Sequence, residues 1–168
     1  MTDPTAEWTD NVDSALDRLR DFFLPADFPY DFSVESLIPL EGLLLERYSS
    51  GEPLPAGDDF IASMMAYVGE VALALVGGSW QVRDGRPTVT PDPCLALPSI
   101  DPLAMLIEAA RAGTGKELAQ AAWRWREVAA AHAEFTPPGH PEAPPPTGSD
   151  ALASWLAART ASASTACW

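Results

Sequence analysis

A nearly uninterrupted apolar stretch between residues 59 and 76 constrains this chain more than any other feature. The stretch "FIASMMAYVGEVALALV" carries apolar side chains on more than one side of a helix, with a single carboxylate, Glu70, in its second half. A helix that is apolar almost all round is stable in water only when neighbouring elements enclose it. We therefore expect a central helix that begins at Asp58 or Asp59, ends before Gly77-Gly78, and has the remaining elements packed around it.

Other segments with helical spacing of apolar residues supply these neighbours. We expect helices over residues 5–23, from a cap at Ser33 to about Tyr48, from Asp101 to Arg111, and up to about Glu134. The apolar stripe of the first comprises Trp8, Val12, Leu16, Leu19, Phe22 and Phe23. The stripe of the second comprises Leu37, Leu40, Glu41, Leu44 and Leu45.

The segments between these helices predict a small amount of β-structure. Residues 24–32 contain two prolines and should lay Phe28, Tyr30 and Phe32 against the body as an extended segment. Asp84-Gly85 predicts a tight hairpin between two short strands. Residues 92–102 are apolar but interrupted by prolines, which is typical of an edge strand or a packed loop. The fold class is α+β, a mostly helical single domain with a small β-hairpin.

Proline content divides the carboxy-terminal part from this domain. Between residues 136 and 148, six of 13 residues are proline, which indicates a semi-rigid linker without core-forming residues. Residues 149–168 then carry Leu152, Trp155 and Leu156 at helical spacing. We expect a domain over residues 1–135, a linker over 136–148, and a short amphipathic helix with a flexible tail over 149–168. That helix is too short to be stable alone and should dock on another surface, either this domain's own or, as we favour, that of a partner.

Acidic residues dominate the charge and concentrate in the first third of the chain. The 168 residues carry a formal net charge of −14, and residues 1–60 hold 14 Asp and Glu against three Arg, a net charge of −11. Asp10, Asp13, Asp17 and Asp21 lie on the polar faces of the first helix. Nucleic acids and anionic membranes attract clusters of Lys and Arg, so both are disfavoured as partners. A basic protein is favoured, and a merely solubilising surface is the alternative.

Cysteine content and the first residues indicate the compartment. Two cysteines, Cys94 and Cys167, are too few for a disulfide scaffold and lack metal-ligand spacing. The start "MTDPTAEWTD" has neither the basic nor the apolar region of a secretory signal. The apolar run is shorter than the roughly 20 residues that span a bilayer. We expect a cytoplasmic protein with no cofactor.

Glu70 is the residue on which an enzymatic interpretation would depend. The residues three and four positions from Glu70 on the helix are Ala66, Tyr67, Leu73 and Ala74, so no second carboxylate, His or Cys shares its face. A general acid or base at Glu70 would need a distant partner folded against it. We therefore interpret Glu70 as a structural buried carboxylate that accepts hydrogen bonds from main-chain amides, an arginine or the Trp80 indole. Gly69 and Ala66 should allow another backbone to approach closely. A small enzyme that uses Glu70 is the alternative.

Two other motifs could suggest a phosphate-binding loop and a cysteine nucleophile, but their neighbouring residues favour neither. The segment "GTGKE" (113–117) lacks the glycine and the hydroxyl residue that a phosphate-binding loop requires, so we expect a turn between two helices. Cys94 lies among apolar residues and is expected to be a buried thiol.

The carboxy-terminal segment "RTASASTACW" predicts a different use of the chain. Ser162, Ser164 and Thr165 lie within a few residues of Cys167, a spacing that suits dehydration and thioether closure in the precursor of a modified peptide. The folded part would then act as the leader. The alternative is a frayed end.

Three blocks resemble the ordered regions of small acidic bacterial proteins, chiefly actinobacterial, that have no assigned function. The blocks are "DFSVESLIPLEGLL" (31–44), "AYVGEVALALVGGSW" (66–80) and "PSIDPLAMLIEAARAGTGKEL" (98–118). They correspond to a Ser-Leu…Leu-Glu helix, a Tyr-Val-Gly-Glu helix ending in Gly-Gly-x-Trp, and a proline-initiated helix. The resemblance covers about residues 30–120 and implies an α+β domain with no known catalytic set. Some such proteins are thought of as immunity or accessory factors.

These observations together favour a non-enzymatic function. We expect an accessory, immunity-like factor that binds a protein partner through its acidic amino-terminal region, with Leu152, Trp155 and Leu156 as a second contact. The precursor of a modified peptide and the small enzyme that uses Glu70 remain the alternatives.

Overall fold

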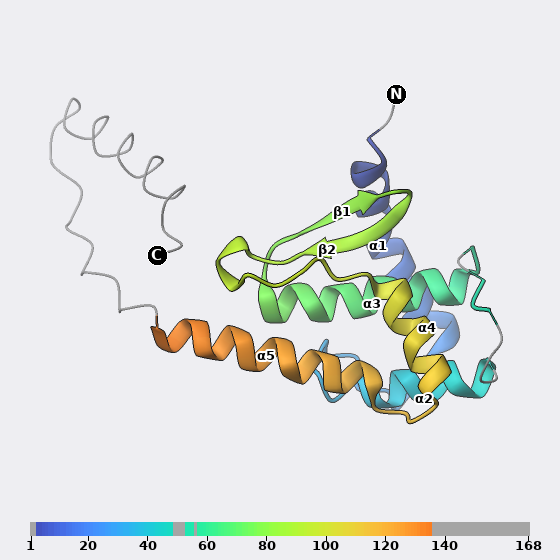
Figure 1. Cartoon of the computed structure of the whole chain (residues 1–168). Coiled ribbons are helices and arrows are strands. Elements are labelled where there is room, and N and C mark those ends of the chain that lie inside the picture. The colour runs from blue at the N-terminus through green and yellow to red at the C-terminus, as the bar shows by residue number, and fades with distance from the viewer. Residues whose placement is uncertain (1–2, 49–52, 56, 136–168) are drawn as a thin grey trace, which may run out of the picture. The chain divides into compact units, whose positions relative to one another are not determined.

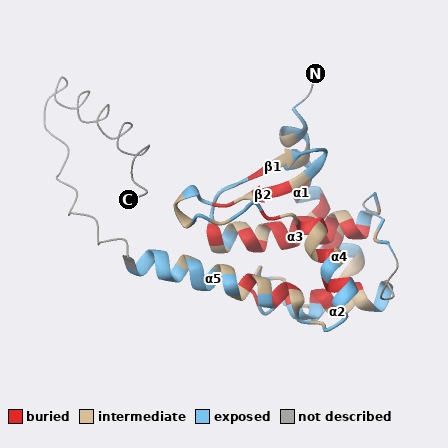
Figure 2. Cartoon of the chain, in the orientation of Figure 1, coloured by how far each residue is buried: buried red, intermediate tan, exposed pale blue. Residues whose placement is uncertain are grey.

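Helix α3 (Asp59–Val76) is the central element of the computed structural model, which describes residues 3–48, 53–55 and 57–135 (Figure 1). Twelve of its 18 residues are buried, and Figure 2 shows this burial along nearly the whole helix. The Asp58 side chain caps the first turn by accepting from the N–H groups of Phe60 and Ile61 at 2.9 and 3.4 Å. Gly77, with φ of 61°, ends the helix. The prediction of an enclosed central helix is confirmed.

The other helices surround α3 and make the described chain mostly helical. They are α1 (Pro4–Arg18) with the π-helical turn η1 (Leu19–Phe23), α2 (Leu37–Arg47), α4 (Pro102–Ala112) and α5 (Glu117–Phe135). α1 and α4 pack against α3, and α2 packs against α4. Residues Met1–Ala130 form one compact unit, and of the second, Ala131–Trp168, only the end of α5 is described.

Within the described residues, one antiparallel hairpin completes the α+β fold. β1 (Ser79–Arg83) and β2 (Arg86–Thr90) meet at the Asp84-Gly85 turn, where both residues have positive φ, 52° and 74°. Positive φ at both central residues is the geometry of the tight turn that the sequence predicts. Residues 92–102 do not form a full edge strand. They contain the 3₁₀ turn η2 (Pro93–Leu95) and one bridge, in which Ile100 and Val89 exchange hydrogen bonds of 2.8 Å.

The start of α2 differs from the prediction. The helix begins at Leu37, whereas a cap at Ser33 was expected. Ser33 accepts a hydrogen bond from the Ser36 N–H at 3.1 Å through its hydroxyl, and its carbonyl accepts from the Ser36 hydroxyl at 2.7 Å. The first of these is the bond that an N-cap serine makes with the N–H three residues later. Ser33 thus caps the turn of residues 34–36, which leads into the α-helix without being part of it.

The apolar stripe of the first helix also departs from the prediction at its end. Leu19 is fully buried as expected, but Phe22 is 79% exposed. The chain changes from α-helix to π-helix at Leu19, and the Leu24 N–H donates to the Leu19 carbonyl five residues earlier at 3.0 Å. A π turn holds more residues than an α turn, so the residues that follow shift around the helix axis. Phe22 therefore faces outward.

The extended segment after α1 packs its aromatic residues on one tyrosine of α3. The rings of Phe28, Tyr30 and Phe32 lie 6.0, 5.4 and 4.8 Å from the Tyr67 ring, centroid to centroid. The Tyr67 hydroxyl donates to Ser36 Oγ at 2.8 Å and accepts from the Phe32 N–H at 3.1 Å. Tyr67 is fully buried, so these bonds satisfy a polar group that water does not reach.

Gly69 allows a side chain, not a backbone, to approach α3. A Cβ atom at this position would collide with the Trp80 ring, which lies directly over the glycine. The prediction of a close backbone approach is therefore corrected at Gly69. Because Gly69 has no side chain, Trp80 of the β-hairpin can pack directly against α3.

We expect Gly69→Ala to lower the free energy of unfolding by about 1–3 kcal/mol or more, because overpacking displaces Trp80. Gly42→Ala in α2 is the matched control, since a Cβ there meets nothing within 4 Å. Its better helix propensity should raise stability by up to about 1 kcal/mol. Urea denaturation of both variants measures the difference. Equal effects of the two substitutions would contradict the close approach of Trp80.

Burial of Tyr67 predicts a loss of stability at alkaline pH. Burial raises the pKa of its phenol above the usual value, while the hydrogen bond to Ser36 lowers it by less. The folded state thus holds the proton more tightly than the unfolded chain. The stability that neutral Tyr67 contributes is complete below about pH 10 and is lost as the pH rises through the raised pKa of the folded state.

Denaturation midpoints measured from neutral to strongly alkaline pH test this expectation. Stability should fall above about pH 10, together with the appearance of phenolate absorbance in the ultraviolet. Tyr67→Phe should be less stable at neutral pH but should show a shallower alkaline decline. An unchanged slope in this variant would show that Tyr67 is not the responsible group.

Candidate functional site

The outer face of α1 carries the four aspartates that the sequence singles out. Asp10, Asp13, Asp17 and Asp21 are all exposed, and they follow one another at intervals of three, four and four residues. These intervals place side chains on one face of a helix. The opposite face is formed by Val12, Ala15 and Leu19, which are buried. The result is a helix and its π-helical extension with an acidic side toward solvent.

Arginine side chains neutralise only part of the negative charge of this acidic face. Arg20 forms ion pairs of 2.9 Å with both Asp17 and Asp21, and the hydrogen bond and charge of Asp21, followed by the charge of Asp17, raise the pKa of Arg20. Among the described residues, Asp10 and Asp13 form no ion pair. The half of the face nearest the start of α1 therefore keeps its negative charge.

Glu70 accepts a hydrogen bond from one of the groups expected for it. The Trp80 indole Nε1–H donates to Glu70 Oε1 at 2.8 Å. The carboxylate is not enclosed, however, because Glu70 is only half-buried. The expectation of a buried carboxylate at this position is corrected. Glu70 lies on the side of α3 that the hairpin covers incompletely, and it anchors the same tryptophan that packs on Gly69.

The fully buried carboxylate of the described chain is Glu41 on α2. It has no exposed surface, and its Oε2 accepts from the Leu118 N–H at 2.9 Å, in the first turn of α5. Its Oε1 has no hydrogen-bond partner within the described chain. Helix N-termini present unpaired N–H groups and a positive partial charge, so a carboxylate is well placed there. Glu41 thus ties α2 to α5 across 77 residues of sequence.

Sequence reasoning did not assign a role to Glu41, although the signal was present. The residue falls in the apolar stripe of its helix, four residues after Leu37 and three before Leu44, which are both fully buried. A carboxylate at such a position faces the core and needs a buried donor. Its partner lies in another helix and cannot be read from local spacing.

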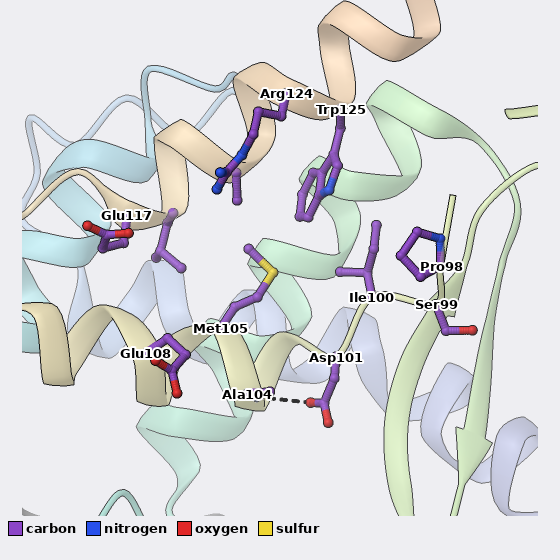
Figure 3. Close-up of a pocket in the computed structure, with 12 residues that line it drawn as sticks. Pro98, Ser99, Ile100, Asp101, Ala104, Met105, Glu108, Glu117, Arg124 and Trp125 are labelled. Atoms are coloured by element: carbon purple, nitrogen blue, oxygen red, sulfur yellow. Dashed lines mark hydrogen bonds between the residues drawn. The ribbon is translucent and has the colours of Figure 1, made fainter. Parts of the chain in front are cut away.

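A groove of about 440 Å³ runs between α4, α5 and the segment that precedes α4 (Figure 3). Figure 3 shows Arg124 and Trp125 on α5 above Met105 of α4. The apolar lining residues are Pro98, Ile100, Ala104, Met105, Leu118, Ala121 and Trp125. The polar lining residues are Ser99, Asp101, Glu108, Glu117 and Arg124. The volume lies within the range of about 300–1,000 Å³ that is usual for binding cavities.

The carboxylates of this groove have positions that the fold partly explains. Asp101 caps α4 by accepting from the Ala104 N–H at 3.0 Å and lies 3.7 Å from Arg86. Glu108 pairs with Arg111 at 2.7 Å. Glu117 accepts from the Thr114 hydroxyl at 3.1 Å. Three acidic side chains and one guanidinium therefore border an apolar floor.

The remaining sequence motifs occupy ordinary structural positions or lie outside the described residues. "GTGKE" is the turn between α4 and α5, with Gly113 and Gly115 at φ of 64° and 73°. Cys94 is half-buried in η2, whereas a buried thiol was expected. The predictions for residues 136–148 and 149–168 concern segments outside the described residues. The second segment includes Leu152, Trp155, Leu156, Ser162, Ser164, Thr165 and Cys167.

Two further properties concern metal binding and membrane insertion. Within the residues that the structure describes, no three His, Cys, Asp or Glu side chains are grouped so as to hold a metal ion. α3 is long and apolar enough to cross a membrane by length and composition, but 67% of it is buried inside the protein, which is the pattern of a core helix.

Comparison of the chain with protein-family models, curated proteins and solved structures finds no match. The resemblance to small acidic bacterial proteins therefore stays a prediction. Function has to be argued from the acidic face of α1 and the groove between α4 and α5.

Substitution of Glu41 and of Glu70 should show how much each carboxylate contributes to the free energy of unfolding. We expect Glu41→Ala to lower the free energy of unfolding by about 2–5 kcal/mol, because it leaves the buried Leu118 N–H unpaired and opens a cavity. Glu70→Ala should cost about 1–3 kcal/mol through the lost bond to Trp80. Glu46→Ala, an exposed change on the same helix as Glu41, should stay within about 0.5 kcal/mol. Chemical denaturation ranks the three, and a Glu41→Ala value no larger than that of Glu46→Ala would refute the buried contact.

Proposed function

We propose that this protein is a non-enzymatic accessory factor, of the immunity kind, that binds a basic protein partner through the outer face of α1. One observation carries the proposal: Asp10, Asp13, Asp17 and Asp21 are all exposed on one face of a helix whose other face is buried. Such a face presents a row of carboxylates to an approaching protein.

Repulsion between the aspartates on the outer face of α1 supports a role in binding and not in stability. Like charges three or four residues apart on a helix destabilise it by about 0.2–0.5 kcal/mol per pair. Arg20 offsets this repulsion at Asp17 and Asp21. No described cation does so at Asp10 and Asp13. A basic partner would supply the counter-charges that these two aspartates lack.

The net charge of the chain favours the same class of partner. A molecule with a formal charge of −14 attracts a cationic protein over distances of roughly the Debye length, about 8–10 Å at physiological salt. Electrostatic attraction of this kind mainly accelerates association. An immunity-like factor benefits from fast association because it must capture its partner before the partner acts.

Photo-crosslinking in the native host identifies the partner and tests the proposal. A photoreactive amino acid in place of Ser14, which is exposed among the four aspartates, should capture a protein with excess Lys and Arg. With that protein in hand, Asp10→Asn/Asp13→Asn should slow association at low salt by about tenfold. Dissociation and the melting temperature should change little, and the difference from the wild type should shrink at high salt.

Glu46→Gln/Glu127→Gln is the matched control, because it removes two exposed carboxylates from α2 and α5 without touching α1. Association should stay within about twofold of the wild type. Equal slowing in both double variants would leave only a general charge effect and would contradict a binding role for α1. Crosslinking to an acidic or neutral protein would contradict the basic partner.

A further inference from the structure

We propose that the groove between α4 and α5 is the docking site for an amphipathic helix of the partner, one that carries Lys or Arg beside its apolar face. The inference rests on the proposed function in one respect, the basic character of the partner. It adds a second contact surface on other helices, and it names the secondary structure of the segment that binds there.

The floor of the groove is apolar and incompletely covered. Met105 and Trp125 are half-buried, and Ile100 and Leu118 complete the surface beneath them. Their side chains come from three separate segments, α4, α5 and the strap of residues 98–101 (Figure 3). Methionine adapts its shape to a partner, and tryptophan offers a large rigid contact area. Residues of this kind dominate the energy of protein interfaces.

Small residues line both walls of the groove. α4 and α5 form its walls, and small residues, Ala104 and Ala121, line them. Short side chains on the two walls leave room for the backbone of a third helix to come close. An amphipathic helix that lays its apolar face between two helices is a recurrent mode of peptide recognition.

The charge of the rim selects the sequence of that helix. Asp101, Glu108 and Glu117 border the apolar floor, which Arg124 also lines. Asp101 caps α4 and lies 3.7 Å from Arg86. Glu108 pairs with Arg111, but the side chains of this pair are 64% and 69% exposed. An exposed ion pair contributes little and exchanges partners readily, and Glu117 forms no ion pair within the described chain. Lys or Arg residues that flank the apolar face of the incoming helix would therefore meet Glu117 and replace Arg111 at Glu108.

Methyl NMR of the full chain with ¹³C-labelled methionine tests the inference. The probe is a synthetic peptide of about 15 residues, made of Leu and Lys at helical spacing. The chain has four methionines. Met105 lies in the groove, whereas Met64 and Met65 are buried in α3 and report on the integrity of the core. We expect a saturable shift of the Met105 signal, with those of Met64 and Met65 unchanged.

A matched pair of variants locates the binding on the groove. Ala121→Arg places a long side chain in the groove wall, and Ala130→Arg adds the same charge at an exposed position of the same helix. Ala121→Arg should weaken peptide binding by at least about tenfold, and Ala130→Arg should leave it within about twofold. Unshifted Met64 and Met65 signals in both variants verify that they fold. A peptide with Glu in place of Lys should not shift Met105.

Several results would overturn the inference. Equal weakening by both variants, or an unmoved Met105 signal, would show that the peptide binds elsewhere through charge alone. A Met105 signal that moves with protein concentration would assign the groove to a second copy of the chain. One that moves on Leu152→Ala/Trp155→Ala without peptide would assign it to the chain's own residues 149–168.

The same measurement keeps this inference separate from the role of α1. Asp10→Asn/Asp13→Asn should slow association with the crosslinked partner, yet leave peptide binding at Met105 within about twofold. Ala121→Arg should weaken the partner complex chiefly by faster dissociation, because apolar anchors determine the lifetime of a complex. Partner binding that depends on α1 but not on Ala121 would refute the docking role of the groove and leave the role of α1 intact. Peptide binding that depends on Ala121 but not on α1 would support the groove even if the acidic face had no role.

Discussion

Enclosure of α3 is the constraint on which the rest of the structure depends. The helix contributes to two clusters of buried side chains, one with α2, α4 and the start of α5, the other with α1, the hairpin and Ile100. Because α3 contributes to both clusters, its displacement would disturb the packing of both. Two contacts on α3 set the geometry: the aromatic segment around Tyr67, and the Trp80 ring against Gly69. The second places the hairpin, which in turn holds Ile100 beside the groove.

Elements defined by short-range rules were predictable from the sequence. Asp58 and Asp101 each cap a helix that begins one residue later, and Gly77 and Gly113 end helices with positive φ. The Asp84-Gly85 turn follows from the same conformational preference. In each case the physical cause lies within four residues of its effect. The α+β class and the helix order follow from such signals together with the apolar periodicity.

Features that depend on distant partners or on a change of helix type were not predictable in this way. Periodicity assigns Phe22 to the buried stripe, but a single π turn moves it to the surface. Ser33 acts as a cap, but of the turn of residues 34–36 that leads into the helix. Glu70 stands out because its sequence neighbours are apolar, whereas the buried carboxylate is Glu41, whose donor is 77 residues away. The acidic stripe was visible in the sequence, whereas the groove needs the folded arrangement of three segments.

The burial of Glu41 has a consequence for the groove that links stability to binding. A buried carboxylate with one unpaired oxygen is expensive for a fold, and a well-packed apolar residue at that position would often be at least as stable. What the carboxylate provides is position: it holds the Leu118 N–H in the first turn of α5, and the Leu118 side chain lies in the groove. α5 is thereby held at its first turn by a directional bond, in addition to nondirectional apolar packing. A surface held in place before its ligand arrives loses less entropy on binding, so affinity for an incoming helix increases without additional contacts.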